Sequence, residues 1–271
     1  MTAPISGTTR LAAVLGWPVA HSRSPALHNA AFAAAGVDAV YVALPVPPAE
    51  LATVLRALAA TGALGASVTV PHKEAALAAC TRVDALAARA GAVNCVVFTG
   101  GEIVGHNTDA GGFVDALAEA GVVVAAGRRA VVLGGGGAAR AVAMGLGDAG
   151  AEVIVVARRP EAVAWCAARA WAALADALAD AALLVDATSA GLAPATELAL
   201  AEQVPLERLP ASAAVATLVY HRPTALLARA AAAGHVTVDG GGMLLHQAAR
   251  AFALWTGQPA PLAVMRAALA G

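Results

Sequence analysis

Lysine is almost absent from this chain of 271 residues. Sixteen of its 17 basic residues are arginines, and the one lysine is Lys73. Asparagine is found at three positions, Asn29, Asn94 and Asn107, whereas alanine is abundant throughout. Such a bias replaces lysine with arginine wherever a position tolerates the exchange. A lysine that persists against the bias therefore indicates a position at which arginine cannot supply the same chemistry.

Charged and aromatic residues are also scarce, at 13% and 4% of the chain. The formal net charge of -1 and the pI of about 6.6 leave no basic stripe for nucleic acid, so we expect no nucleic-acid partner. The mean hydropathy is high, at +0.71, but no uninterrupted apolar run reaches the roughly 18 residues that span a bilayer. We therefore expect no membrane segment, and the first ten residues do not resemble a secretion signal.

Cysteine and histidine show no spacing typical of a metal site. The three cysteines, Cys80, Cys95 and Cys166, are odd in number and lack CxxC spacing, which argues against a disulfide framework or a zinc knuckle. The seven histidines form no HExxH motif. We expect no bound metal and a soluble protein of the reducing cytoplasm.

Short apolar runs alternate with longer alanine-rich stretches, which is typical of the α/β class. In the first half we expect strands at 11–16, 40–44, 66–70, 94–98 and 102–105, and helices at 24–35, 48–60, 75–90 and 110–120. In the second half we expect strands at 129–133, 152–156, 183–187, 214–218 and 236–238, and helices at 144–149, 243–255 and 261–270. We place one domain at 1–109, to which the C-terminal helices 242–271 return, and a nucleotide-binding domain at 110–241.

A glycine-rich turn follows the expected strand at 129–133. Gly134, Gly136 and Ala139 satisfy the GxGxxG/A spacing, in which the first glycine permits a tight turn, the second lets backbone approach a pyrophosphate, and the small third residue permits close helix packing. The following helix offers free N–H groups to phosphate. We predict dinucleotide contacts along the whole turn, at Gly134, Gly135, Gly136, Gly137, Ala138 and Ala139.

Arg158 and Arg159 follow the next strand, at the place where NAD-binding folds usually carry an acidic residue for the ribose 2′-hydroxyl. Two guanidinium groups suit a 2′-phosphate through charge and forked hydrogen bonds. The pair therefore favours NADP(H) over NAD.

Four segments of the first domain gather the uncommon polar residues. They are 16–25, 67–74, 91–94 and 105–109, and they offer hydroxyl and amide groups, the lone ammonium of Lys73 and the carboxylate of Asp109. Most follow expected strands, where α/β proteins place ligands. This chemistry suits a small carboxylated or polyhydroxylated ligand, with Lys73 able to exchange a proton when Asp109 holds it.

At these residues the sequence strongly resembles the shikimate dehydrogenase family. The resemblance covers essentially the whole chain and includes Ser22-Arg23-Ser24, Val70-Pro71-His72-Lys73, Asp186-Ala187-Thr188, Leu218-Val219-Tyr220 and Asp239-Gly240-Gly241-Gly242-Met243-Leu244 with Gln247. It implies two domains, an N-terminal α/β substrate domain and a Rossmann-type NADP-binding domain. It also implies NADPH-dependent, reversible reduction of 3-dehydroshikimate to shikimate in aromatic amino-acid biosynthesis.

The resemblance also assigns roles to residues. It implies that Lys73 and Asp109 are the catalytic pair. Substrate is expected to contact Ser22, Ser24, Thr69, Asn94, Tyr220 and Gln247. The cofactor is expected to contact Thr188, Leu218 and Gly240 in addition to the glycine turn and the two arginines.

Some positions depart from the family pattern: Ser67, Trp17, His106, Arg159 and Thr217. They leave open a related dehydrogenase for quinate or aminoshikimate. An NADPH-sensing regulator without activity is another alternative, although it has no need of the Lys73 and Asp109 pair, and a folate-dehydrogenase-like enzyme is disfavoured by the Ser-x-Ser loop. The sequence is compatible with a monomer or a homodimer.

Overall fold

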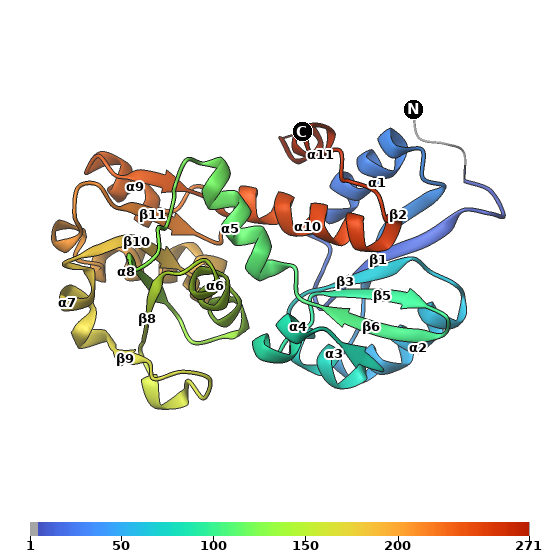
Figure 1. The fold of residues 1–271 in the computed structure, drawn as a ribbon, viewed down its shortest axis with the longest axis horizontal. Coiled ribbons are helices and arrows are strands. Elements are labelled where there is room, and N and C mark those ends of the chain that lie inside the picture. The colour runs from blue at the N-terminus through green and yellow to red at the C-terminus, as the bar shows by residue number, and fades with distance from the viewer. Residues whose placement is uncertain (1–4, 271) are drawn as a thin grey trace. The chain divides into compact units, whose positions relative to one another are not determined.

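A computed structural model of the chain describes residues 5–270 (Figure 1). They form two compact units: the described residues up to Thr108 together with those from Leu245 on, and Asp109–Leu244. Each unit is built on one six-stranded sheet, which confirms the predicted α/β class. Within residues 5–270, no helix has the length and apolar character needed to cross a membrane.

The sheet of the first unit mixes parallel and antiparallel strands in the order β2-β1-β3-β5-β6-β4. β1, β2 and β3 are parallel, whereas β5 is antiparallel to both β3 and β6. The start of β5 and the end of β6 therefore lie at the same edge as the carboxyl ends of β1 and β3. The strands are β1 (Arg10–Gly16), β2 (Ala39–Pro45), β3 (Gly65–Val68), β4 (Arg82–Val83), β5 (Cys95–Thr99) and β6 (Glu102–His106).

Helices cover both faces of this sheet, as Figure 1 shows. Alternate residues of β1 point to opposite faces: Ala12 and Val14 join one core, and Ala13 and Leu15 the other. The first core is completed by α1 (Ser24–Ala35), by α10 (Gly240–Thr256) from Leu245 on, and by α11 (Leu262–Ala270). The second is completed by α2 (Leu51–Ala60), which follows the 3-10 turn η1 (Pro48–Glu50), and by α3 (Lys73–Ala79) and α4 (Ala85–Ala90).

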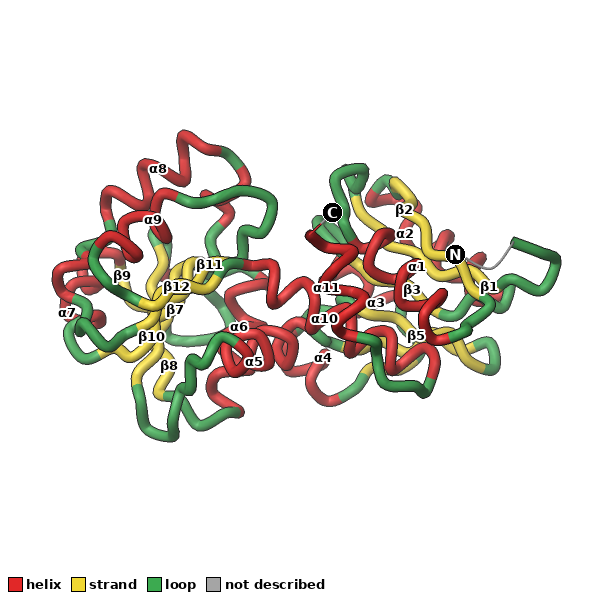
Figure 2. The backbone as a smooth tube through the Cα atoms, turned by 90° about the horizontal axis from the view of Figure 1, so that it is seen from above, coloured by secondary structure: helices red, strands yellow, loops and turns green. Residues whose placement is uncertain are grey.

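The sheet of the second unit is entirely parallel, in the order β12-β11-β10-β7-β8-β9. Figure 2 shows its strands with helices on both sides. The strands are β7 (Arg129–Leu133), β8 (Glu152–Ala157), β9 (Arg169–Ala170), β10 (Ala181–Asp186), β11 (Ala214–Thr217) and β12 (Val236–Val238). After β9 the chain returns to the other side of β7, so the strand order reverses between β7 and β10. In open parallel sheets, ligands bind at the carboxyl ends of strands beside such a reversal.

Helices also cover both faces of the second sheet. One face packs against α5 (Asp109–Glu119) and α6 (Gly137–Asp148), and the other against α7 (Leu174–Leu178), α8 (Pro194–Gln203) and α9 (Ala225–Ala232). The connections include the 3-10 turns η2 (Pro160–Ala162), η3 (Trp171–Ala173), η4 (Ser189–Leu192) and η5 (Leu206–Arg208). The sequence patterns did not indicate α7, α8, α9 or β9.

One expected helix is wrong. In place of a single helix over 75–90 the structure has α3, the short strand β4 and α4. The Thr81 N–H donates to the Ile103 carbonyl at 2.8 Å, and the Asp84 N–H donates to the Gly105 carbonyl at 2.9 Å. The Asp84 carboxylate then caps α4 by accepting the Ala87 N–H at 2.6 Å. Pairing with a distant strand thus interrupts a segment whose local composition favours helix.

Candidate active site

Asn94 joins three of the polar segments at one edge of the first sheet. Its side-chain oxygen accepts the Thr108 N–H at 2.7 Å, and its Nδ2 donates to the Thr108 hydroxyl at 2.9 Å. Its backbone N–H donates to the His106 carbonyl, and its carbonyl accepts the Val68 N–H. Asn94 is only 3% exposed. This residue therefore fixes the ends of β3 and β6 against each other.

The backbone of Lys73 is hydrogen-bonded to Val93, the residue that precedes Asn94. It is the first residue of α3, and its carbonyl accepts the Val93 N–H at 2.9 Å. The preceding loop is held at Thr69, whose N–H donates to the Leu15 carbonyl at 2.9 Å. The neighbouring His72 is buried and its Nε2 lies 2.8 Å from the Val46 carbonyl. The segment around Lys73 is thus held at three points, near the ends of β1 and β2 and just before the start of β5.

Asp109 follows Thr108 directly and begins α5, the first element of the second unit. One peptide bond therefore separates it from the residue that Asn94 holds, a Cα–Cα step of about 3.8 Å. The segment before it is held a second time, because Asn107 Nδ2 donates to the Ala92 carbonyl at 3.1 Å. The chain thus enters α5 from a backbone position that two asparagines fix.

The loop with Ser22 and Ser24 follows β1 and is tied to the loop before Lys73. The Trp17 N–H donates to the Val70 carbonyl at 3.1 Å, and the Ser24 N–H donates to the Ser22 hydroxyl at 3.3 Å. The peptide bonds before Pro18 and Pro71 are both cis. Ser24 begins α1 and is buried, whereas Ser22 is half-buried. The first unit therefore brings together Ser22, Ser24, Thr69, Lys73 and Asn94 along one sheet edge.

Two further expected substrate contacts lie elsewhere in the chain. Gln247 is on α10 between Leu245 and Ala248, which pack in the first unit's core. Tyr220 belongs to the second unit, in the connection between β11 and α9, where its ring meets the ring of His221 edge-on at 5.8 Å.

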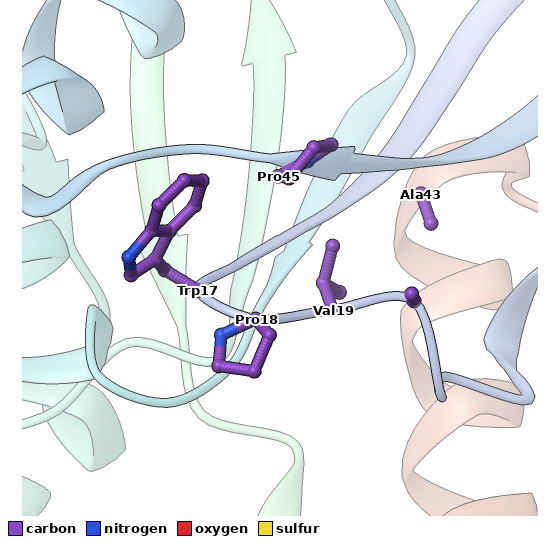
Figure 3. Close-up of a pocket in the computed structure, with 6 residues that line it drawn as sticks. Trp17, Pro18, Val19, Ala43 and Pro45 are labelled. Carbon is purple, nitrogen blue, oxygen red and sulfur yellow. The ribbon is translucent and has the colours of Figure 1, made fainter.

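A pocket of about 450 Å³ lies beside the serine loop. Figure 3 shows its lining, which comes from the loop after β1 and from the end of β2: Trp17, Pro18, Val19, Ala20, Ala43 and Pro45. These side chains offer no charge and a single polar atom, the indole nitrogen. The pocket is therefore unsuited to a carboxylate or a polyol, and we do not assign the substrate to it.

The expected cofactor residues all follow carboxyl ends of the second sheet. The glycine turn follows β7, Arg158 and Arg159 follow β8, Thr188 follows β10, Leu218 follows β11 and Gly240 follows β12. Because all these strands are parallel, their carboxyl ends lie along one edge of the sheet. The structure thus brings this set together, around the reversal of strand order between β7 and β10.

The glycine turn has the conformation and the space that a dinucleotide needs. Gly134 has φ of +115°, and a Cβ there would stand 3.0 Å from the Ala187 carbonyl oxygen at the end of β10. A Cβ on Gly136 or Gly137 would meet nothing within 4 Å, so open space lies in front of the start of α6. The first N–H groups of α6 have no acceptor within the helix. These features fit a pyrophosphate.

Hydrogen bonding and close packing also order other expected cofactor residues at this edge of the second sheet. The Asp186 carboxylate accepts the Thr188 N–H at 2.9 Å, and burial raises the pKa of Asp186. A Cβ on Gly240 would stand 2.2 Å from the Leu218 carbonyl oxygen, so only glycine permits this approach of the two chain segments. Arg158 and Arg159 are exposed at the end of β8. Residues 5–270 contain no group of three or more acidic, histidine or cysteine residues arranged to hold a metal.

Sequence reasoning missed residues that position this edge. Thr108 donates its N–H to the Asn94 side-chain oxygen and accepts a hydrogen bond from Asn94 Nδ2 at its hydroxyl. His72 Nε2 lies within hydrogen-bond distance of the Val46 carbonyl, which follows β2. The signal that the sequence offers for them is their position next to expected site residues, in Asn107-Thr108-Asp109 and His72-Lys73. In the second unit, Trp165 donates a hydrogen bond to the glycine turn.

Comparison with known proteins identifies relatives along the whole chain. Residues 14–96 match the shikimate dehydrogenase substrate binding domain, and residues 240–270 match the shikimate 5'-dehydrogenase C-terminal domain. The NADP(+) shikimate dehydrogenase of Acidiphilium cryptum is 49% identical over 260 residues, which cover 93% of this chain and 92% of the relative.

Solved structures agree. The shikimate 5-dehydrogenase of Thermus thermophilus, solved with NADP(H) and shikimate, superposes with a TM-score of 0.86 at 39% identity, covering 97% of this chain and 99% of the relative. The quinate dehydrogenase of Corynebacterium glutamicum, solved with NAD, superposes with a TM-score of 0.85 at 32% identity, covering 96% and 98%. With 49% identity over 93% of its length to one such enzyme, the chain belongs to the shikimate dehydrogenase family.

Proposed function

We propose that this chain catalyses the NADP-dependent, reversible reduction of 3-dehydroshikimate to shikimate, as a step of aromatic amino-acid biosynthesis. The observation that carries the proposal is the junction around Asn94, which fixes the backbone of Thr108 and lies one hydrogen bond from Lys73. It holds the candidate proton donor at the same sheet edge as hydroxyl and amide groups suited to a polyol.

The protein's own part in the reaction is to bind, orient and protonate. Ser22 and Ser24 hold the substrate carboxylate, together with Tyr220. Thr69, Asn94 and Gln247 bind the ring hydroxyls. Lys73, held by Asp109, gives its Nζ proton to the C3 oxygen as that oxygen becomes a hydroxyl, and recovers a proton from solvent.

In this proposal the second unit binds the cofactor and the first unit binds the substrate, with a boundary near residue 109. NADPH supplies the hydride when it is bound. Gly134–Ala139 hold the pyrophosphate with backbone N–H groups, and Arg158 and Arg159 bind the 2′-phosphate. Thr188, Leu218 and Gly240 line the same edge. The enzyme acts in the cytoplasm, as a monomer or a homodimer.

Purified protein tests the reaction when it is mixed with NADP⁺ and, in separate assays, with shikimate, quinate or aminoshikimate, while the absorbance of the reduced cofactor is followed. We expect turnover to be fastest with shikimate. A preference for quinate would instead indicate a quinate dehydrogenase, in which the Ser67 departure from the family pattern affects substrate choice. Absence of turnover with all three would refute the dehydrogenase and favour the sensing alternative.

Two substitutions at one position test the proton donor. Lys73→Ala removes the ammonium, and Lys73→Arg keeps a positive charge that cannot exchange a proton at neutral pH. Both variants should lose at least about 100-fold in kcat while NADP⁺ affinity is unchanged. An active Lys73→Arg enzyme would show that charge alone suffices and would refute the assigned role.

A further inference from the structure

The connection between β8 and β9 lies against the glycine turn. Trp165 Nε1–H, in the middle of this connection, donates to the Gly135 carbonyl at 2.9 Å. Val163 Cγ2 would stand 2.4 Å from a Cβ on Gly135, so the valine packs directly on the glycine. The connection therefore contacts the turn through both an apolar contact and a directional hydrogen bond.

The hydrogen bond to Gly135 also determines where the next N–H points. In a planar trans peptide the carbonyl and the following N–H point in opposite directions. With the Gly135 carbonyl held toward Trp165, the Gly136 N–H points away from it. Gly136 is the N-cap residue of the 12-residue helix α6, and a Cβ on it would face open space. Trp165 thus fixes the orientation of a donor at the place where a pyrophosphate fits.

The connection also begins with the candidate 2′-phosphate residues. Arg158 and Arg159 precede η2, and Trp165 follows three residues after that turn ends. We propose that Trp165 is a positioning residue for the dinucleotide: its indole N–H holds the Gly135 carbonyl so that the glycine turn keeps its N–H groups aimed at the diphosphate. The inference rests on the proposed cofactor site in the second unit.

Trp165→Phe keeps an aromatic ring and removes the N–H. Because NADP⁺ and NAD⁺ share the diphosphate, we expect the Kd of both to rise by about three- to tenfold, as for the loss of one hydrogen bond. The Kd is measured by calorimetry on the full chain, without turnover. The KM for shikimate at saturating NADP⁺ should not change. Trp171→Phe is the matched control, since Trp171 packs on the opposite face of the same sheet, and should bind like the wild type.

Each other outcome overturns the proposal. Equal affinities in Trp165→Phe and wild type would show that the hydrogen bond has no role in binding. Weaker binding of NADP⁺ alone would show that Trp165 acts through the arginines rather than through the glycine turn. If the wild type binds neither dinucleotide, the proposed function fails as well, which distinguishes the two failures.

A second measurement needs no variant that might misfold. In the wild type, hydrogen exchange of the Trp165 indole N–H, followed by NMR, should be slow and should slow by a further several-fold when NADP⁺ is added. An exchange rate that NADP⁺ leaves unchanged would contradict the proposed link between the Trp165 hydrogen bond and dinucleotide binding.

Discussion

His28 gives the first unit a stability that depends on pH. The side chain is completely buried on α1, where its ring stacks on Tyr41 at 4.4 Å and lies 4.9 Å from the ring of Trp255. Neither ring nitrogen has a hydrogen-bond partner among the described residues. Burial lowers the pKa of His28 from 6.5 to about 3. The native protein therefore holds this histidine neutral throughout the range in which most proteins are handled.

The direction of the effect follows from where the proton binds. Below pH 6.5 the unfolded chain takes up a proton at His28 that the native state refuses, so acid favours unfolding. The contribution to stability is complete above pH 6.5 and is lost progressively as the pH falls toward 3. Each pH unit in this window is worth about 1.4 kcal/mol. Between pH 8 and pH 5 the free energy of unfolding should thus fall by about 2 kcal/mol on account of His28 alone.

Urea unfolding of wild type and His28→Leu at pH 8, 7, 6 and 5 measures this contribution. Tryptophan fluorescence is a suitable probe, because Trp255 lies next to His28. The carboxylates titrate alike in both proteins, so the difference between the two curves isolates the histidine. The wild type should lose about 2 kcal/mol more than the variant between pH 8 and pH 5, a shift of about 1 M in the urea midpoint. His21→Gln, at an exposed histidine, is the control and should follow the wild type.

Parallel pH dependences for wild type and His28→Leu would refute the reasoning. They would mean that the buried ring accepts a proton in the native state, through water or through movement of its aromatic neighbours.

Other substitutions test the packing and the turn. Gly65→Ala places a Cβ 2.1 Å from Trp255 Nε1 and 2.3 Å from a backbone oxygen, so it should destabilise by about 1–3 kcal/mol or more in thermal unfolding, and an unchanged Tm would contradict the packing. Tyr41→Phe removes a buried hydroxyl that makes no hydrogen bond of normal geometry with the described residues, so the free energy of unfolding should stay within about 0.5 kcal/mol or rise. Gly136→Ala should weaken NADP⁺ binding at unchanged Tm, whereas Gly135→Ala should lower the Tm; the reverse order would remove the case for open space at Gly136.

The sequence was most informative where local pattern and chain direction suffice. The strand over 129–133 and the glycine turn could be predicted because both are encoded within a short segment, and a helix was expected after them at 144–149, although it begins earlier, at Gly137. The observed strand and helix are Arg129–Leu133 and Gly137–Asp148. Given parallel strands, residues that follow different strands must share an edge, so the gathering of Arg158 and Thr188 with the turn needed no side-chain detail.

The rest depended on contacts between distant residues. The interruption of the helix at Thr81–Asp84 depends on pairing with β6, and no residue pattern in the alanine-rich segment 75–90 indicates that pairing. The hydrogen bond from Trp165 to Gly135 spans 30 residues and leaves no periodic signal. The stacking of His28 on Tyr41 joins a helix to a strand in the same way. Local propensity does not predict such pairings, because they form only when the sheet has assembled.

The three rare asparagines show how far the composition argument extends. The Asn29 side chain accepts the Tyr41 N–H and donates to the Tyr41 carbonyl, at 2.8 and 2.9 Å, and the Asn94 amide likewise uses both its oxygen and its nitrogen on Thr108. Asn107 donates to a backbone carbonyl. An amide offers a donor and an acceptor on one short side chain, and neither alanine nor arginine supplies both. These hydrogen bonds give each asparagine a structural role whether or not a ligand is bound. For Lys73 the hydrogen bond to Val93 uses only the backbone carbonyl, which any residue provides. The proposed role of Lys73 rests instead on its ammonium group, and the exchange that tests it is Lys73→Arg.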